Sequence, residues 1–164
     1  MITAIVFFVQ PNTMTSAYLQ QARPFSLYLQ RQLDNQRLNL NLMETWLSRP
    51  LNLDDFANFA PWPTLIENRD EEALSRQLRI LRRHVVCQIM VRDLCRLAPL
   101  SEVTSSITLF ADFAVNTALV YAENHYEHMY GKPLGAFTGN EQHLTVVGMG
   151  KMGGYELNVS SDID

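Results

Sequence analysis

The most informative stretch of this 164-residue chain is Gly148-Met-Gly-Lys-Met-Gly-Gly-Tyr-Glu-Leu-Asn-Val-Ser-Ser-Asp-Ile-Asp164. Its glycine-rich turn follows an apolar run, and it closes with two aspartates at positions i and i+2. Successive side chains of a β-strand alternate between its faces, so Asp162 and Asp164 are expected on one face with Cα atoms roughly 6–7 Å apart. Two such carboxylates can bracket a hard divalent cation such as Mg²⁺. The pattern therefore predicts a strand at Leu144–Gly148, a turn, and a second strand with a metal site.

Two other phosphate-binding motifs share part of this pattern. Gly148-x-Gly150-x-x-Gly153 matches the dinucleotide-binding fingerprint letter for letter. That fingerprint needs a full helix after the glycines and an acidic residue about 20 positions on, whereas Asn158-Val-Ser-Ser161 interrupts any helix after about two turns. A Walker A loop would need a glycine at Thr145 and a hydroxyl residue at Met152. Both motifs are therefore disfavoured.

A glycine pair followed by Asp-hydrophobic-Asp resembles the pattern of the nucleotidyltransferase superfamily. Glycines have no Cβ atom, so triphosphate oxygens can approach the backbone N–H groups closely. The resemblance implies that Gly153 and Gly154 bind nucleotide or phosphate. It also implies that Asp162 and Asp164 are catalytic and hold Mg²⁺. Ser161 either hydrogen-bonds a phosphate or caps the strand.

The same stretch more specifically resembles the signature of the glutamine synthetase adenylyltransferase family. The run Leu78–Arg92 also resembles the helical segment before the signature in the N-terminal half of that family, so the resemblance covers roughly residues 70–164. Members carry two related nucleotidyltransferase domains on one long chain. The N-terminal domain removes AMP from a tyrosine of glutamine synthetase by phosphorolysis, and the C-terminal domain attaches AMP from ATP.

This resemblance implies several partners, and the chain also departs from the family pattern in two respects. The implied partners are glutamine synthetase, a PII-type signal protein, ATP or ADP, and phosphate, and the implied location is the cytoplasm. The family pattern includes a third carboxylate on a later strand and a whole second half, which these 164 residues lack. The chain is therefore expected to be inactive by itself.

A non-enzymatic helical docking or regulatory module is the alternative function. Arg76, Arg79 and Arg83 are spaced i, i+3 and i+7, with Arg82 adjacent, so they share one face of a predicted helix. Such a face either binds an acidic partner or a substrate phosphate, or is simply solvated.

Composition narrows the class of protein. A hydrophobic content of 47% with 10% aromatic residues is typical of a soluble globular chain, and the net charge of −4 disfavours nucleic-acid binding. The apolar lead-in Met1–Pro11 lacks a basic region and is too short to cross a membrane, so neither a signal peptide nor a membrane segment is expected. Cys87 and Cys95 lie eight residues apart in a predicted helix, about 12 Å in rise, which is too far for a disulfide.

The remaining sequence predicts a mostly α fold with two parts. Residues 1–140 form a helical region, and residues 141–164 form the incomplete start of an α/β nucleotidyltransferase domain. Because two strands alone do not make a stable sheet, residues 142–164 should be loose unless the helices cover them.

Three long helical segments are expected within the helical region. One spans about Ser16–Ser48 with an interruption at Pro24. Two stronger ones span about Arg69–Leu97 and Ser101–Tyr130, and the short turn at Pro99 should make them pack antiparallel. Asn68 with Glu71 resembles a capping box at the start of the second helix. Residues 50–62 form a connector in which Asp54-Asp55 could open one helical turn.

Overall fold

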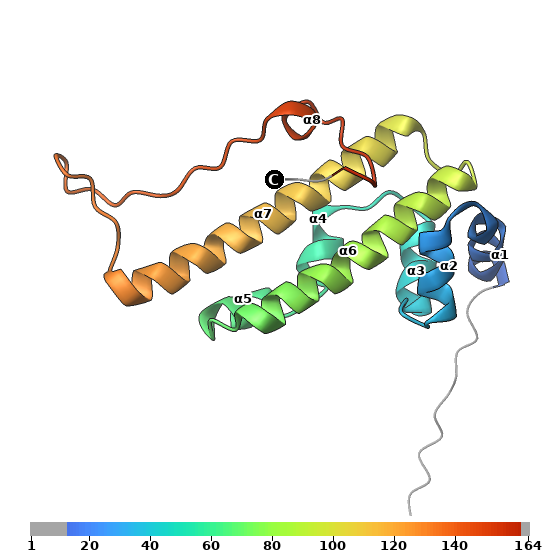
Figure 1. The fold of residues 1–164 in the computed structure, drawn as a ribbon, viewed down its shortest axis with the longest axis horizontal. Coiled ribbons are helices and arrows are strands. Elements are labelled where there is room, and N and C mark those ends of the chain that lie inside the picture. The colour runs from blue at the N-terminus through green and yellow to red at the C-terminus, as the bar shows by residue number, and fades with distance from the viewer. Residues whose placement is uncertain (1–12, 162–164) are drawn as a thin grey trace, which may run out of the picture.

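The computed structural model describes residues 13–161, and within this range every regular element is helical (Figure 1). The elements are α1 (Thr13–Ala22), the 3₁₀ helix η1 (Arg23–Phe25), α2 (Leu27–Asp34), α3 (Leu40–Leu47), α4 (Leu53–Ala57), α5 (Trp62–Glu67), α6 (Glu71–Leu94), α7 (Leu100–Tyr130) and α8 (Gly150–Gly153). The mostly α class predicted from the sequence is confirmed. The lead-in Met1–Pro11 lies outside the described residues.

Two long helices, α6 and α7, form the centre of the fold and run antiparallel, as predicted (Figure 1). Their boundaries agree with the expected ranges to within a few residues. The apolar stripe of α6 is buried at Leu74, Leu81, Val85 and Ile89. The facing stripe of α7 is buried at Val103, Ile107, Phe110 and Tyr121, whereas Ala118 is exposed. The spacing of three or four residues between successive apolar positions thus identified the packed faces of both helices.

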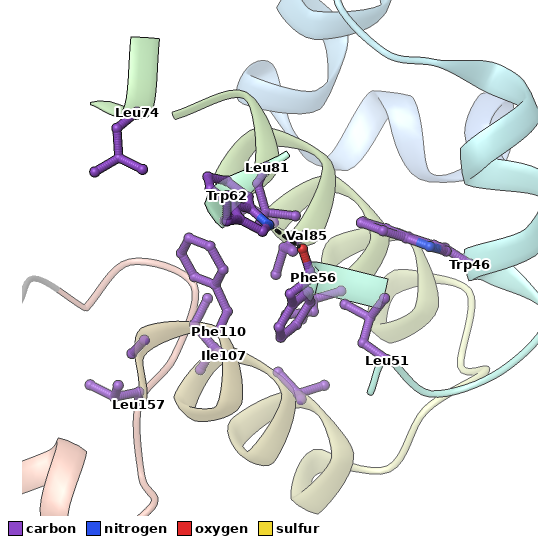
Figure 2. Packing of buried hydrophobic residues seen from close by; sticks show 14 of the residues in the cluster. Trp46, Leu51, Phe56, Trp62, Leu74, Leu81, Val85, Ile107, Phe110 and Leu157 are labelled. Carbon is purple, nitrogen blue, oxygen red and sulfur yellow. Dashed lines mark hydrogen bonds between the residues drawn. The ribbon is translucent and has the colours of Figure 1, made fainter. Parts of the chain in front are cut away.

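The short helices α3 to α5 each contribute one buried aromatic side chain to this core, namely Trp46, Phe56 and Trp62 (Figure 2). Phe56 of α4 is fully buried, and its ring meets that of Phe110 edge-on at 6.0 Å between centroids. The indole Nε1 of Trp62 donates a 2.8 Å hydrogen bond to the carbonyl oxygen of Phe56, so a buried indole donor is satisfied. Asn52 and Asp55 form a capping box at the start of α4, which confirms the helical turn expected at Asp54-Asp55.

The start of α6 differs from the expected capping box. Asp70 is the N-cap, and its side chain accepts a 2.9 Å hydrogen bond from the backbone N–H of Ala73. Asn68 instead ends α5, because the N–H groups of Arg69 and Asp70 return to the carbonyl oxygens of that helix. Asn68 and Asp70 both suit an N-cap by residue type, but Asn68 is already the C-cap of α5.

The first predicted helix is divided into separate segments. The interruption at Pro24 appears as η1, as expected. A second break between α2 and α3 was not predicted: Gln36 has φ +52°, and Asn39 caps α3 by accepting from the N–H groups of Asn41 and Leu42. Local side-chain hydrogen bonds to the backbone favour this break over a continuous helix.

His84 of α6 joins the N-terminal helices to the core. Its Nε2 accepts a 2.9 Å hydrogen bond from the N–H of Asn39, and its Nδ1 donates to the carbonyl oxygen of Ile80. Burial lowers the pKa of His84 below its ordinary value, so the ring is neutral at pH 7. This histidine is a structural bridge and not a metal ligand.

Both cysteines are free, as predicted. Cys87 is buried in the cluster between α6 and the N-terminal helices. Burial raises the pKa of its thiol to about 12, so it stays protonated.

Helix α7 is long and apolar enough to cross a membrane by length and composition alone. Its buried residues, among them Ile107 and Phe110, belong to the same cluster as the buried stripe of α6. The core helix of a soluble protein passes the same test, so this property is weak evidence for a membrane segment.

Candidate functional site

The segment before the glycine-rich turn runs back alongside α7 without forming a strand (Figure 1). Leu144, Val146 and Val147 are exposed, and the N–H of Leu144 donates to Glu123 Oε1 of α7 at 3.1 Å. The structure therefore differs from the strand predicted at Leu144–Gly148. A strand needs a neighbour for its ladder, and residues 13–161 provide only an isolated bridge between Leu134 and Glu141.

The glycine-rich turn forms the single-turn helix α8, and its glycines are needed at specific positions. Gly150 has φ +58°, in the left-handed region that favours glycine. A Cβ atom on Gly153 would lie 2.5 Å from the carbonyl oxygen of Gly148, closer than van der Waals contact permits. A Cβ atom on Gly154 would lie 3.3 Å from the carbonyl oxygen of Gly150, which is tight. Gly153 is therefore the glycine on which the shape of the turn depends most.

The helix α8 ends in a Schellman motif. The N–H of Glu156 donates to the carbonyl oxygen of Lys151 at 2.7 Å, and that of Tyr155 donates to Met152 at 3.2 Å. The N–H of Gly154 likewise donates to Gly150 at 2.9 Å. The N–H groups of Gly153 and Gly154 are therefore used for hydrogen bonds within the turn. Because neither residue has a Cβ atom, a ligand could still approach the backbone closely there.

The residues after the turn are anchored on the helices. Leu157 is buried beside Ile107 and Phe110 in the main core cluster (Figure 2), and Met152 and Val159 are partly buried against the same cluster. The helices therefore cover part of residues 150–161, whereas Leu144, Val146 and Val147 are exposed. The looseness expected for uncovered residues stays a prediction for 142–149. The burial of Leu157 could not be predicted from the sequence, because a single leucine forms no periodic apolar pattern.

Ser161 lies in a turn organised by Asn158. Its hydroxyl accepts a 3.1 Å hydrogen bond from the N–H of Asn158 and lies 3.3 Å from Asn158 Oδ1. The same Oδ1 accepts from the N–H and the hydroxyl of Ser160. Ser161 therefore has a local structural role, and its hydroxyl hydrogen is held only by a long hydrogen bond.

Asp162 and Asp164 lie outside the described residues, so their metal role stays a prediction. Within residues 13–161 no group of three or more His, Cys, Asp and Glu side chains is placed to hold a metal ion.

Two hollows on α7 are each lined by one predicted site residue, Gly153 in the first and Ser161 in the second. One, of about 250 Å³, lies between α7 and the glycine-rich turn, and its lining includes Asp112, Asn116 and Gly153. The other, of about 370 Å³, lies between α6 and α7, and its lining includes Arg79, Arg82 and Ser161. Val115 of α7 lines both, so the hollows are neighbours. No motif pointed to Asp112 or Asn116, because their proximity to the turn arises only from the tertiary fold.

The sequence was also compared with known families, and one family model, described as glutamate-ammonia ligase adenylyltransferase, matches residues 17–164. The chain belongs to this family. The match includes the whole stretch Gly148–Asp164 and extends to the N-terminal helices, well before the Leu78–Arg92 segment that carried the resemblance.

Relatives of this adenylyltransferase family are much longer than the chain. Two proteins from strains of Neisseria meningitidis are 55% identical over 151 residues, which is 92% of this chain and 17% of each relative. A protein from Chromobacterium violaceum is 45% identical over 150 residues, covering 92% of this chain and 16% of its own length. All three are named bifunctional glutamine synthetase adenylyltransferase/adenylyl-removing enzyme. No solved structure matches the chain.

Proposed function

We propose that the chain is the N-terminal part of an enzyme that removes AMP from, and attaches AMP to, a tyrosine of glutamine synthetase, and so regulates nitrogen assimilation. The observation that carries this proposal is the family match over residues 17–164, which contains the glycine-rich turn and both aspartates. The exposed apolar side chains of Leu144, Val146 and Val147 fit a segment that pairs with further strands in a longer protein.

Each residue of the candidate site has a separate proposed role. Asp162 and Asp164 are proposed to be catalytic and to hold Mg²⁺, since two carboxylates spaced i and i+2 supply the oxygen ligands that this ion prefers. Bound there, the ion would neutralise charge that develops on the transferred phosphoryl group. Gly153 and Gly154 are proposed to let the nucleotide or phosphate approach the backbone, and Ser161 is proposed to hydrogen-bond a phosphate oxygen.

The proposed removal reaction is an in-line displacement at phosphorus. An oxygen of inorganic phosphate attacks the phosphorus of the AMP group while the bond from phosphorus to the tyrosine oxygen breaks. The tyrosine oxygen takes up a proton and leaves as the free phenol, and the other product is ADP. The attachment reaction uses ATP and is assigned, by family resemblance, to the other domain of the longer enzyme.

The proposed partners follow from the same resemblance. They are glutamine synthetase, ATP or ADP, phosphate, and a PII-type signal protein that would bind elsewhere on the longer enzyme. A cytoplasmic location is proposed, without a nucleic-acid partner, which the net charge of −4 supports. No role at a membrane is proposed, because the apolar face of α7 is packed in the core.

A helical docking or regulatory module is the second candidate function. This candidate rests on the predicted arginine face of α6. Arg76, Arg79 and Arg82 are exposed there, whereas Arg83 is only partly exposed. None of the four has an ion-pair partner among residues 13–161. Binding of glutamine synthetase to a chain that carries Asp162→Asn/Asp164→Asn, without any AMP transfer by the longer protein, would favour this candidate.

The isolated chain is expected to have no adenylyl-removing activity, because the proposed site needs a further carboxylate. The test incubates adenylylated glutamine synthetase with phosphate and Mg²⁺, and follows AMP-group release as ADP. A longer protein that contains this sequence and the rest of the family's length should release ADP, and the 164-residue chain at the same concentration should release none. Detectable release by the chain alone would overturn the proposal that its site is incomplete.

A further inference from the structure

The hollow between α6 and α7 places two arginines of the helical region beside Ser161. Arg79 and Arg82 both line this hollow of about 370 Å³, together with Ser161. The two arginines are spaced i and i+3, so their side chains lie on the same side of α6. Ser161 directly precedes Asp162 in the sequence. Residues about 80 positions apart in the chain are thus neighbours in the fold.

We propose that Arg79 and Arg82, with the hydroxyl of Ser161, form a binding site for inorganic phosphate. The arginines are positively charged at all relevant pH values, and their planar guanidinium groups match phosphate oxygens in geometry. The choice of phosphate as the anion rests on the proposed phosphorolysis; the site itself rests on the geometry of the hollow.

Within residues 13–161 the charges of this site are unpaired. Among residues 13–161 neither Arg79 nor Arg82 has a carboxylate within ion-pair distance, although arginines elsewhere in the fold, such as Arg49 and Arg92, do. Both residues are exposed, so an anion can reach them. An incoming phosphate would therefore not have to displace a bound carboxylate of the described fold.

Arg79, Arg82 and Ser161 are the polar side chains that line this hollow. Apart from the arginines and Ser161 the lining is apolar, and it consists of Leu78, Phe110, Ala111, Ala114, Val115 and Ala118. The polar contacts to a bound phosphate would therefore come from these three side chains.

Ser161 can add a donor to the site. Its hydroxyl hydrogen is directed at Asn158 Oδ1 over 3.3 Å, and that oxygen already accepts two hydrogen bonds from Ser160. Turning the hydroxyl hydrogen toward a phosphate oxygen would therefore leave Asn158 Oδ1 satisfied.

The test is a titration of the purified chain with inorganic phosphate, followed by NMR at the Nε–Hε signals of its arginines. The signals of Arg79 and Arg82 should shift in a saturable way. The variant Arg79→Gln/Arg82→Gln should bind phosphate roughly tenfold or more weakly, since each charged hydrogen bond contributes appreciably. Both residues are exposed, so the variant should keep its fold, which far-UV circular dichroism checks.

The matched control is Arg76→Gln. Arg76 is exposed on α6 three residues before Arg79, but it does not line the hollow, so its loss should change phosphate affinity less than about twofold. Equal weakening by Arg76→Gln, an absence of saturable shifts, or shifts with an acidic peptide but not with phosphate would each overturn the site.

A kinetic readout separates this inference from the proposed function. In the longer enzyme, Arg79→Gln/Arg82→Gln should raise the KM for phosphate roughly tenfold and leave kcat within about twofold. An active longer enzyme whose KM for phosphate is unchanged would overturn the arginine site alone. An enzyme without AMP release would overturn the proposed function, while phosphate binding by the chain would still stand.

Discussion

Replacing Arg92 by Leu is expected to lower the free energy of unfolding of the chain by about 3–5 kcal/mol, because it leaves a largely buried carboxylate and two backbone carbonyl groups without their partner. Arg92 of α6 donates from Nε to Glu102 Oε1 at 2.7 Å and from Nη2 to Oε2 at 3.1 Å. The side chains of Arg92 and Glu102 are only 8% and 15% exposed. This ion pair connects the end of α6 to the start of α7.

The same guanidinium also donates hydrogen bonds to two backbone carbonyl groups. Its Nη1 donates to the carbonyl oxygen of Leu47 at 2.7 Å, and its Nη2 donates to that of Leu97 at 3.1 Å. The first bond satisfies the C-terminal end of α3, and the second fixes the turn between α6 and α7. Arg92→Leu therefore leaves polar backbone groups unpaired in addition to Glu102.

Urea unfolding of three variants measures this effect. Arg92→Leu/Glu102→Leu should recover part of the loss, because it removes the unpaired charge as well. Arg23→Leu breaks an exposed ion pair with Asp34, 2.6 Å long, and should cost less than about 1 kcal/mol. A cost for Arg92→Leu no larger than that for Arg23→Leu would show that Arg92 does not hold the helices together.

Replacing Gly153 by Ala is expected to disrupt the glycine-rich turn. The added methyl group would lie 2.5 Å from the carbonyl oxygen of Gly148, which is backbone and cannot move aside without changing the turn. Overpacking of this kind costs about 1–3 kcal/mol, which should raise amide hydrogen exchange within the turn by roughly five- to hundredfold. The N–H groups of Gly154 and Glu156 are the reporters, because both donate within the turn.

Gly154→Ala is the matched control for this prediction. Its methyl group would lie 3.3 Å from the carbonyl oxygen of Gly150, and the residue has helical backbone angles that alanine adopts readily. We expect its effect on exchange at Glu156 to be well below that of Gly153→Ala. Equal effects of the two variants would mean that the close approach at Gly148 does not determine the turn.

The helical part of the fold could be predicted where the apolar pattern is long. The stripes that begin at Leu74 and Val103 run over many turns, and Pro99 marks the break between them, so α6 and α7 followed from spacing alone. The short helices are harder to predict from the sequence. The break at Gln36–Asn39, for example, depends on side-chain hydrogen bonds to the backbone over two or three residues. The cap of α6 was misplaced because Asn68 belongs to the helix before it.

The sequence allowed candidate site residues to be proposed only where they lie close together in the chain. The glycines, Ser161 and the aspartates share one short stretch of sequence, and their roles stay predictions. The strand expected at Leu144–Gly148 depends on a neighbouring strand, and residues 13–161 contain none. The approach of Arg79 and Arg82 to Ser161 depends on how α6 packs beside the segment that Leu157 anchors. Sequence spacing cannot report contacts of this kind.

The most direct test of the account is the phosphate-dependent release of ADP from adenylylated glutamine synthetase by the longer protein and by its Asp162→Asn and Asp164→Asn variants. Each variant should reduce the rate by about a thousandfold, since stabilising charge on a transferred phosphoryl group contributes several kcal/mol to catalysis, and chelation of Mg²⁺ should abolish the remaining activity. Far-UV circular dichroism and unchanged binding of glutamine synthetase would show that the variants are folded. Release that persists at the normal rate in both variants would contradict the claim that these aspartates form the site of AMP removal.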